Sequence, residues 1–119
     1  MIVTVYNAIY EYEEHIYIDP KDLIWIRPEP DRILHMDIIM MTLGISNGDN
    51  IEIPIFKTTP NTFGALMTSA KLIVRRFVST KKSIMYPETL DAKGKKELES
   101  RGEVFDMFEM QSEAIKSHK

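Results

Sequence analysis

Carboxylates and an imidazole gather near the N-terminus, in the stretch EYEEHIYID at residues 11–19. Its titratable side chains, apart from the tyrosines, are Glu11, Glu13, Glu14, His15 and Asp19. These residue types bind zinc or harder divalent cations in proteins. No second histidine stands at ligand spacing, because His35 and His118 are distant in the sequence. A solvated polar edge of a sheet explains the pattern better, so we predict no metal and no cofactor.

A second arrangement that could do chemistry is the pair His35 and Asp37. Two residues apart on a strand, they would share one face and could act as a general base. A single His–Asp pair at strand spacing is too common to define an active site. The chain also has no glycine-rich phosphate loop, no HExxH and no GxSxG. We therefore expect no catalytic residues and a protein that is not an enzyme.

A basic cluster occurs in KLIVRRFVSTKK, residues 71–82. Its cations are Lys71, Arg75, Arg76, Lys81 and Lys82. They could contact nucleic-acid phosphates, or they could be the cationic end of a helix, where each charge contributes about 0.3–1 kcal/mol. The second interpretation is favoured because the aromatic Phe77 falls on the apolar face and leaves no exposed ring for a base. We expect Leu72, Ile73 and Val74 to join Phe77 in the core.

Aromatic and arginine side chains that are typical of binding hot spots flank the loop RPEPD at residues 27–31. Trp25 lies between Ile24 and Ile26, ahead of the two prolines. Arg27 is the first residue of the loop, and Arg32 follows the loop. A tryptophan in such a place is most often part of the core near the end of a sheet. The alternative is that Trp25, Arg27 and Arg32 contact a partner.

The C-terminal part carries apolar residues on a strongly charged background. Phe105, Met107 and Phe108 lie on or beside an apolar stripe that a helix over residues 91–116 would form. This stripe must be covered, either by the rest of the chain or by a partner protein or a second copy. Methionine suits adaptable binding surfaces, so self-association or docking on a partner is the functional interpretation that we favour.

Composition limits the class of protein further. The chain has 119 residues, no cysteine and a formal charge of −3. Residues 1–79 hold 7 Lys and Arg against 10 Asp and Glu, and residues 80–119 hold 8 against 8. Disulfides and thiolate sites are excluded, and the acidic balance is the wrong sign for a protein bound mainly to phosphates. No apolar run approaches about 20 residues and no secretory signal is visible, so we expect a cytoplasmic protein without membrane contact.

These side chains must be positioned by strands that come first and a helix that follows. Residues rich in β-branched and aromatic types predict strands, which are Ile2–Tyr10, His15–Ile18, 23–27, Ile33–Ile45 and 51–56. RPEPD is expected to end the third strand, because proline cannot donate to a ladder. Asn47–Gly48 predicts a type I′ turn. Apolar residues at three- and four-residue spacing predict a helix near 60–78.

The order of elements predicts an α+β fold, with one antiparallel sheet of four or five strands packed against one helix. We divide the chain into a core domain, residues 1–79, and a charged helical extension, residues 80–119. The expected function is that of a small non-enzymatic interaction or regulatory protein that forms homo-oligomers and binds a partner protein or small ligand. A compact accessory protein of a bacterium or phage would fit. The alternative is a nucleic-acid-binding regulator that uses the basic cluster.

Overall fold

The computed structural model describes residues 2–19, 21–84 and 104–117, and for residues 78–84 and 104 it describes the backbone alone. Within these residues the elements are β1 (Ile2–Asn7), β2 (Tyr12–Tyr17), β3 (Leu23–Ile33), β4 (Met36–Ile45), β5 (Asn50–Thr58), α1 (Phe63–Ile84), β6 (Val104–Asp106) and α3 (Met107–Ser117). No described helix is both long and apolar enough to cross a membrane.

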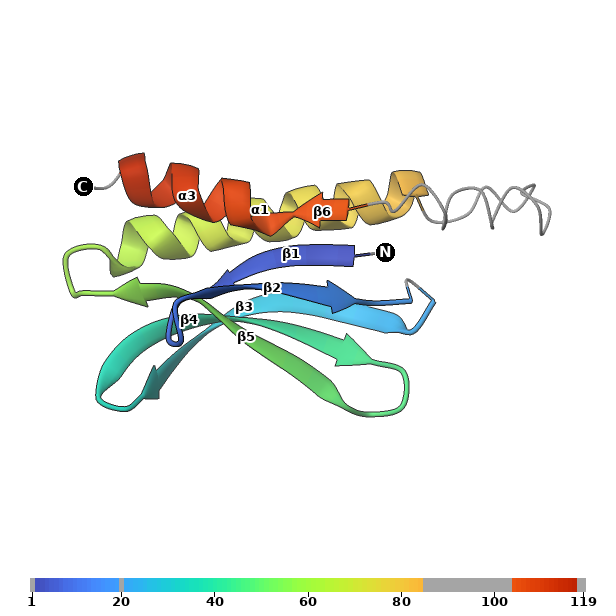
Figure 1. The fold of residues 1–119 in the computed structure, drawn as a ribbon, viewed down its shortest axis with the longest axis horizontal. Coiled ribbons are helices and arrows are strands. Elements are labelled where there is room, and N and C mark those ends of the chain that lie inside the picture. The colour runs from blue at the N-terminus through green and yellow to red at the C-terminus, as the bar shows by residue number, and fades with distance from the viewer. Residues whose placement is uncertain (1, 20, 85–103, 118–119) are drawn as a thin grey trace.

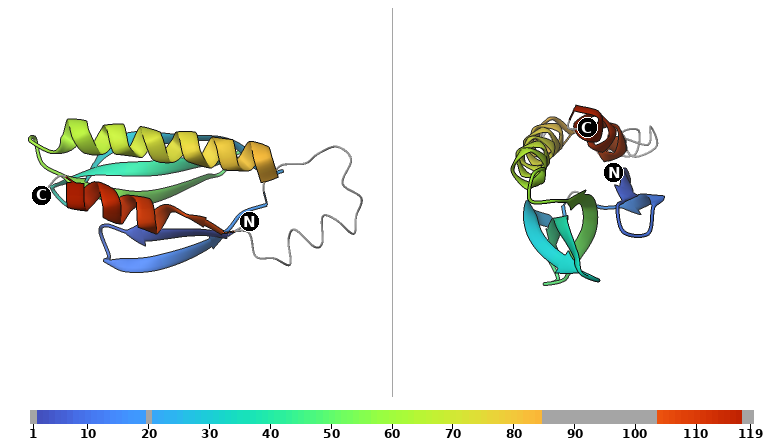
Figure 2. Two further views of the ribbon diagram at one scale, coloured as in Figure 1. Left: turned by 90° about the horizontal axis from the view of Figure 1, so that it is seen from above. Right: turned by 90° about the vertical axis from the view of Figure 1, so that its left-hand side faces the viewer.

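The predicted α+β class is confirmed, but the strands do not form one sheet. The described strands make two three-stranded sheets, ordered β2-β1-β6 and β3-β4-β5. The two described helices, α1 and α3, lie side by side along one side of the strands, as Figures 1 and 2 show. Within the described residues, two helices rather than one therefore cover the sheets.

The sheet β3-β4-β5 is an antiparallel meander. The strand β3 continues through Pro28 and Pro30, where we expected it to end. Because β3 is an edge strand, these prolines remove no donor that a neighbouring strand needs. The predicted strand Ile33–Ile45 is instead divided by a two-residue turn at Leu34 and His35, both with positive φ (52° and 64°).

The turn after β4 also differs from the expected type. Of the residues between β4 and β5, Gly48 alone has a positive φ, 92°, so the turn is not type I′. The Gly48 N–H donates to the carbonyl of Ile45 at 2.9 Å, and Asn47 Oδ1 accepts from the Asp49 N–H at 2.9 Å. The asparagine thus closes the turn with its side chain rather than with a left-handed backbone.

The other sheet joins residues from both ends of the chain. The hairpin β1–β2 is antiparallel, and β6 pairs in parallel with β1, with Val3 opposite Phe105. Residues 104–106 therefore form a strand inside the segment predicted as a helix over residues 91–116. The helix begins only at Met107, and residues 91–103 lie outside the part of the chain that the structure describes.

The core lies between the helices and the strands. Alternate residues of β1 point inward, so Val3 and Val5 are fully buried. From α1 the buried residues are Leu66, Ala70, Ile73 and Phe77, so the expected burial of Ile73 and Phe77 is confirmed, whereas Val74 is half-buried against the core. Phe77 packs edge-on against Phe105 at 4.9 Å between ring centroids. Residues before and after the predicted boundary at 79 therefore belong to one core cluster.

One buried amide bridges the two sheets. Gln111 is 1% exposed, and its Oε1 accepts from the Tyr6 N–H at 2.9 Å. Its Nε2 donates to the carbonyls of Tyr6 (2.8 Å) and Ile55 (2.9 Å). The register of β5 against β4 skips Ile55, and this bulge leaves the Ile55 carbonyl without a partner in β4. The Gln111 side chain thus makes the hydrogen bonds to the Tyr6 backbone that a neighbouring strand would make. It also gives the Ile55 carbonyl at the bulge a donor.

Candidate functional site

The polar residues of the first hairpin do not converge on one point. Glu13 and His15 lie on the outer face of β2, while Glu14 lies on the opposite face. The Tyr12 hydroxyl donates to Glu14 Oε1 at 2.7 Å, and this bond raises the pKa of Tyr12. Among the described residues, no three His, Asp or Glu side chains lie close enough to hold a metal ion.

His35 and Asp37 are separated by the turn that divides the predicted strand. His35 lies in this turn and is exposed, while Asp37 lies in β4 opposite Arg32 of β3. The two side chains therefore do not share a strand face, and the expected basis for a His–Asp general base is absent.

Of the predicted hot-spot residues on β3, the structure brings two together. The Arg27 guanidinium carbon lies 4.4 Å from the centroid of the Trp25 ring, and Arg27 also pairs with Glu29. The half-buried Trp25 covers Gly44 of β4. Successive residues of a strand point to opposite faces, so Arg32 lies on the other face of β3 from Trp25 and Arg27. Trp25 and Arg27 are thus held by contacts within the sheet.

The predicted partner-binding residues near the C-terminus are mostly covered by the chain itself. Phe105 is 6% exposed and Met107 is fully buried, so both are core residues and offer no surface to a partner. Phe108 is half-buried and packs edge-on against Tyr6, 5.6 Å between ring centroids. The aliphatic residue of α3 that is exposed is Ile115.

The basic residues of α1 lie beside a groove. Lys71, Arg75 and Arg76 are exposed, whereas the side chains of Lys81 and Lys82 lie outside what the structure describes. A groove of about 560 Å³ runs between α1 and α3, and Arg75 and Arg76 line it.

The floor of this groove is apolar. It includes Ile73 and Ala114, the half-buried Met110 and Leu72, which is 51% exposed. The expectation that Leu72 belongs to the core is therefore wrong, because it lies beyond the face of α1 that meets the sheet. Glu113 of α3 also lines the groove, so both signs of charge flank the apolar floor.

A smaller pocket of about 360 Å³ lies where the two sheets meet the helices. Tyr6, Ile55, Leu66 and Ile115 supply much of its lining, and Glu11 and Lys57 lie at its edge. Lys57 Nζ is 3.5 Å from Glu11 Oε1, so an ion pair joins the first hairpin to β5.

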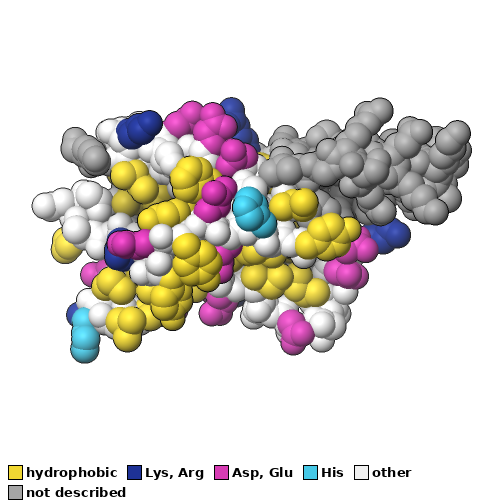
Figure 3. Space-filling view, in the orientation of Figure 1, with side chains coloured by type: hydrophobic (Ala, Val, Ile, Leu, Met, Phe, Trp, Pro, Cys, Tyr) yellow, Lys and Arg dark blue, Asp and Glu magenta, His cyan; other side chains and the backbone are white. Residues whose placement is uncertain are grey.

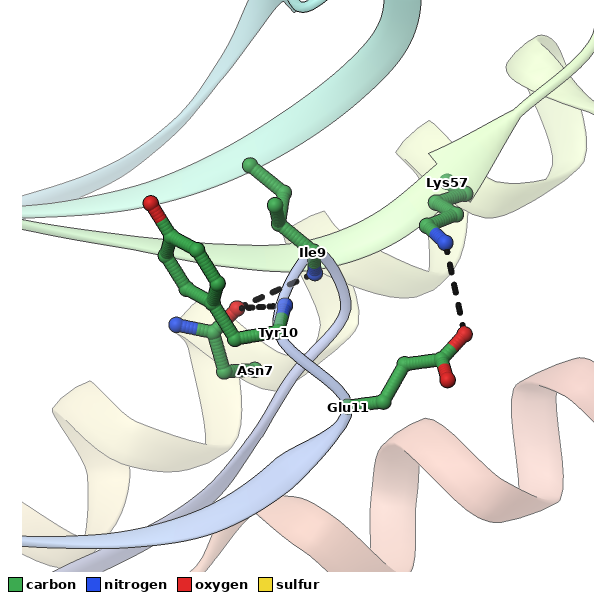
Figure 4. A network of polar contacts seen from close by, with 5 residues as sticks. All are labelled: Asn7, Ile9, Tyr10, Glu11 and Lys57. Carbon is green, nitrogen blue, oxygen red and sulfur yellow. Dashed lines mark hydrogen bonds and ion pairs between the residues drawn. The ribbon is translucent and has the colours of Figure 1, made fainter.

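Asn7 shapes the hairpin turn that carries Glu11. Its Oδ1 accepts from the N–H groups of Ile9 and Tyr10, both at 3.0 Å, and Glu11 takes a φ of 58° (Figure 4). The Asn7 side chain closes the turn without a glycine.

Sequence reasoning missed Gln111 and the pair Glu11–Lys57. A signal for Gln111 was present, since it lies four residues after Met107 and three before Ala114, on the buried stripe of α3. A polar residue on such a stripe indicates a buried hydrogen-bonding role. The pair Glu11–Lys57 had no local signal, because its members are 46 positions apart.

Comparison with known proteins gives no match for this chain among protein-family models, curated proteins or solved structures.

Proposed function

We propose that this protein is a small non-enzymatic interaction protein that works as a homodimer through the groove between α1 and α3. The observation that carries the proposal is the exposed Leu72 on the groove floor, flanked by Arg75 and Arg76 on α1 and by Glu113 on α3. Apolar surface bordered by charges is typical of protein contacts rather than of a small-molecule active site.

The charges of the groove are complementary to those of a second copy. In a two-fold contact the same patch faces itself, so α1 of one copy can lie along α3 of the other. Arg75 and Arg76 then approach Glu113 of the second copy, and the two Leu72 side chains are removed from water. A strongly basic patch alone would repel itself, and the glutamate on the opposite helix relieves this.

Leu72→Glu tests this contact. We expect the wild-type chain to sediment as a dimer and the variant as a monomer, because the variant loses the apolar contact of Leu72 and its carboxylate pairs with Arg75 or Arg76 of its own helix, in competition with Glu113 of the second copy. The matched control is Leu34→Glu, which places the same change at the exposed tip of the β3–β4 hairpin and should leave the dimer intact. A monomeric wild type contradicts the homodimer, and a dimeric Leu72→Glu contradicts the groove as its interface.

The second candidate function is nucleic-acid binding by the same helix, supported by the exposure of Lys71, Arg75 and Arg76. If it holds, Arg75→Glu with Arg76→Glu weakens binding to DNA or RNA by about tenfold or more and flattens its salt dependence. Arg32→Glu, on β3, is the control and should leave binding unchanged. Fluorescence anisotropy at low salt measures this, and a wild type that binds neither nucleic acid removes this candidate.

A further inference from the structure

Among the described residues, no strand pairs with the outer edge of β2. The sheet order β2-β1-β6 ends at β2 within the described residues, and Figure 2 shows β2 at the outer margin, away from β3-β4-β5. The N–H and C=O of Tyr6 both bond to Gln111, on the side away from β2. Tyr6 and its opposite residue Glu13 are therefore a non-hydrogen-bonded pair. By alternation, the backbone groups of Glu13, His15 and Tyr17 point to the outer edge.

The other described strand edges are blocked or occupied. On β3, Pro28 and Pro30 remove donors from the outer edge. On β5, the carbonyl of Pro54 accepts from the Ala8 N–H at 2.8 Å and that of Ile55 accepts from Gln111. The strand β6 has three residues. By contrast, β2 carries no proline, glycine, lysine or arginine over its six residues, and its charged side chains are Glu13 and Glu14, which oppose an acidic strand but not a basic one.

The side chains around this edge are acidic and aromatic. The segment from Tyr10 to Asp19 has carboxylates at Glu11, Glu13, Glu14 and Asp19 and no lysine or arginine, and of these carboxylates Glu11 pairs with Lys57 of β5. The exposed aromatic residues are Tyr10, Tyr12 and Tyr17, the last 72% exposed. On this side of the molecule, Figure 3 shows acidic side chains among hydrophobic ones.

We propose that the outer edge of β2 binds an extended segment of a partner protein that carries lysine or arginine at alternate positions, as an added strand. Backbone hydrogen bonds to Glu13, His15 and Tyr17 supply affinity, and alternate side chains supply selectivity. Residues of the added strand that face Glu13 share its side of the sheet, so a lysine there meets a carboxylate. Aliphatic stems of the basic side chains cover the exposed tyrosine rings.

Charge argues against a second copy of β2 in this place. An antiparallel pair of β2 strands brings a second set of glutamates to the same edge, and the registers that place Glu13 or Glu14 opposite its own copy are destabilised by like charges. The groove is lined by residues of α1 and α3, whereas β2 lies at the outer margin of its sheet (Figure 2), so strand addition at β2 is independent of the proposed homodimer.

The experiment uses the full chain and a short blocked peptide in which lysine alternates with valine. We expect the peptide to bind and to slow hydrogen exchange of the Glu13, His15 and Tyr17 amides by about tenfold or more. A peptide with glutamate in place of lysine should bind at least about tenfold more weakly, because a glutamate then faces Glu13 where a lysine did.

Two variants separate the backbone from the side chain. His15→Pro removes one edge donor and no donor within the β1–β2 ladder, so it should weaken peptide binding about tenfold or more. His15→Ala keeps the N–H and should change binding less than about threefold. Thermal unfolding confirms that both variants fold.

Several results would overturn the proposal. The first is that the lysine peptide does not bind. The second is that it binds but leaves the amides of Glu13, His15 and Tyr17 unprotected. The third is that His15→Pro binds the peptide as tightly as the wild type does. Protection of these amides that rises with protein concentration alone would assign the edge to a second copy instead. Repeating the titration with Leu72→Glu shows whether peptide binding survives loss of the helical contact, so this proposal and the homodimer fail separately.

Discussion

Gln111→Met should lower the free energy of unfolding by about 3 kcal/mol or more, the largest effect that we expect from one side chain. Methionine keeps the size and helix preference of glutamine but removes the amide. The Tyr6 N–H and the carbonyls of Tyr6 and Ile55 then lose their partner, the Gln111 side chain, which is 1% exposed. Each buried polar group left without a hydrogen bond costs about 1–3 kcal/mol. Urea unfolding measures the difference.

The control is Lys116→Met, which adds the same side chain to an exposed position of α3 and should change stability by less than about 0.5 kcal/mol. The amide proton of Tyr6 gives a local readout, because in Gln111→Met it should exchange faster than those of Val3 and Val5. If the free energies of unfolding of the variant and the wild type differ by less than about 1 kcal/mol, water or a shifted backbone satisfies these groups. The Gln111 amide then does not hold the sheets together.

The parts of the fold that follow from local pattern were predictable. The residue types of 2–10 predicted a strand where β1 lies, and three- and four-residue spacing predicted that Ile73 and Phe77 belong to the core. The two sheets were not predictable, because the contacts between them join residues far apart in the sequence, which are Gln111 with Tyr6 and Ile55, Ala8 with Pro54, and Glu11 with Lys57. A side-chain amide that replaces a strand leaves no local periodicity.

The differences in β3 and β6 have a related cause. Proline ends a central strand but not an edge strand. Whether β3 is an edge strand depends on the tertiary structure, so the local sequence does not show it. Residues 104–106 are too few to show a period, so the helical pattern of the residues after them extended over the strand.

The candidate surfaces were predictable only in composition. The basic residues of α1 were visible as a cluster, but the exposure of Leu72 depends on where α3 lies. The acidic segment around β2 was visible too, yet which of its backbone groups point outward follows from the direction of the Tyr6 backbone groups. In both places the residue types were evident, and the neighbouring element decided what they can contact.

Gly44→Ala should destabilise the protein by about 1–3 kcal/mol and displace the ring of Trp25. A Cβ built on Gly44 would overlap the Cε2 and Nε1 atoms of Trp25 and come within 2.7 Å of its Cδ2. The indole must then swing away from the sheet and lose both its cover of Gly44 and its contact with Arg27. Trp25 is the sole tryptophan of the chain, so its fluorescence should shift to longer wavelength as the ring enters water.

The same substitution made in a Trp25→Ala background tests the cause. With the ring removed, Gly44→Ala should cost nothing or stabilise by about 0.5–1 kcal/mol, because glycine weakens a strand interior relative to alanine. The coupling energy of the cycle should therefore exceed about 1.5 kcal/mol. Gly64→Ala is the control in the first turn of α1, where nothing lies within 4 Å of an added Cβ and a stabilisation is expected. Additive effects at residues 25 and 44 would show that the glycine is needed for its backbone rather than for the tryptophan.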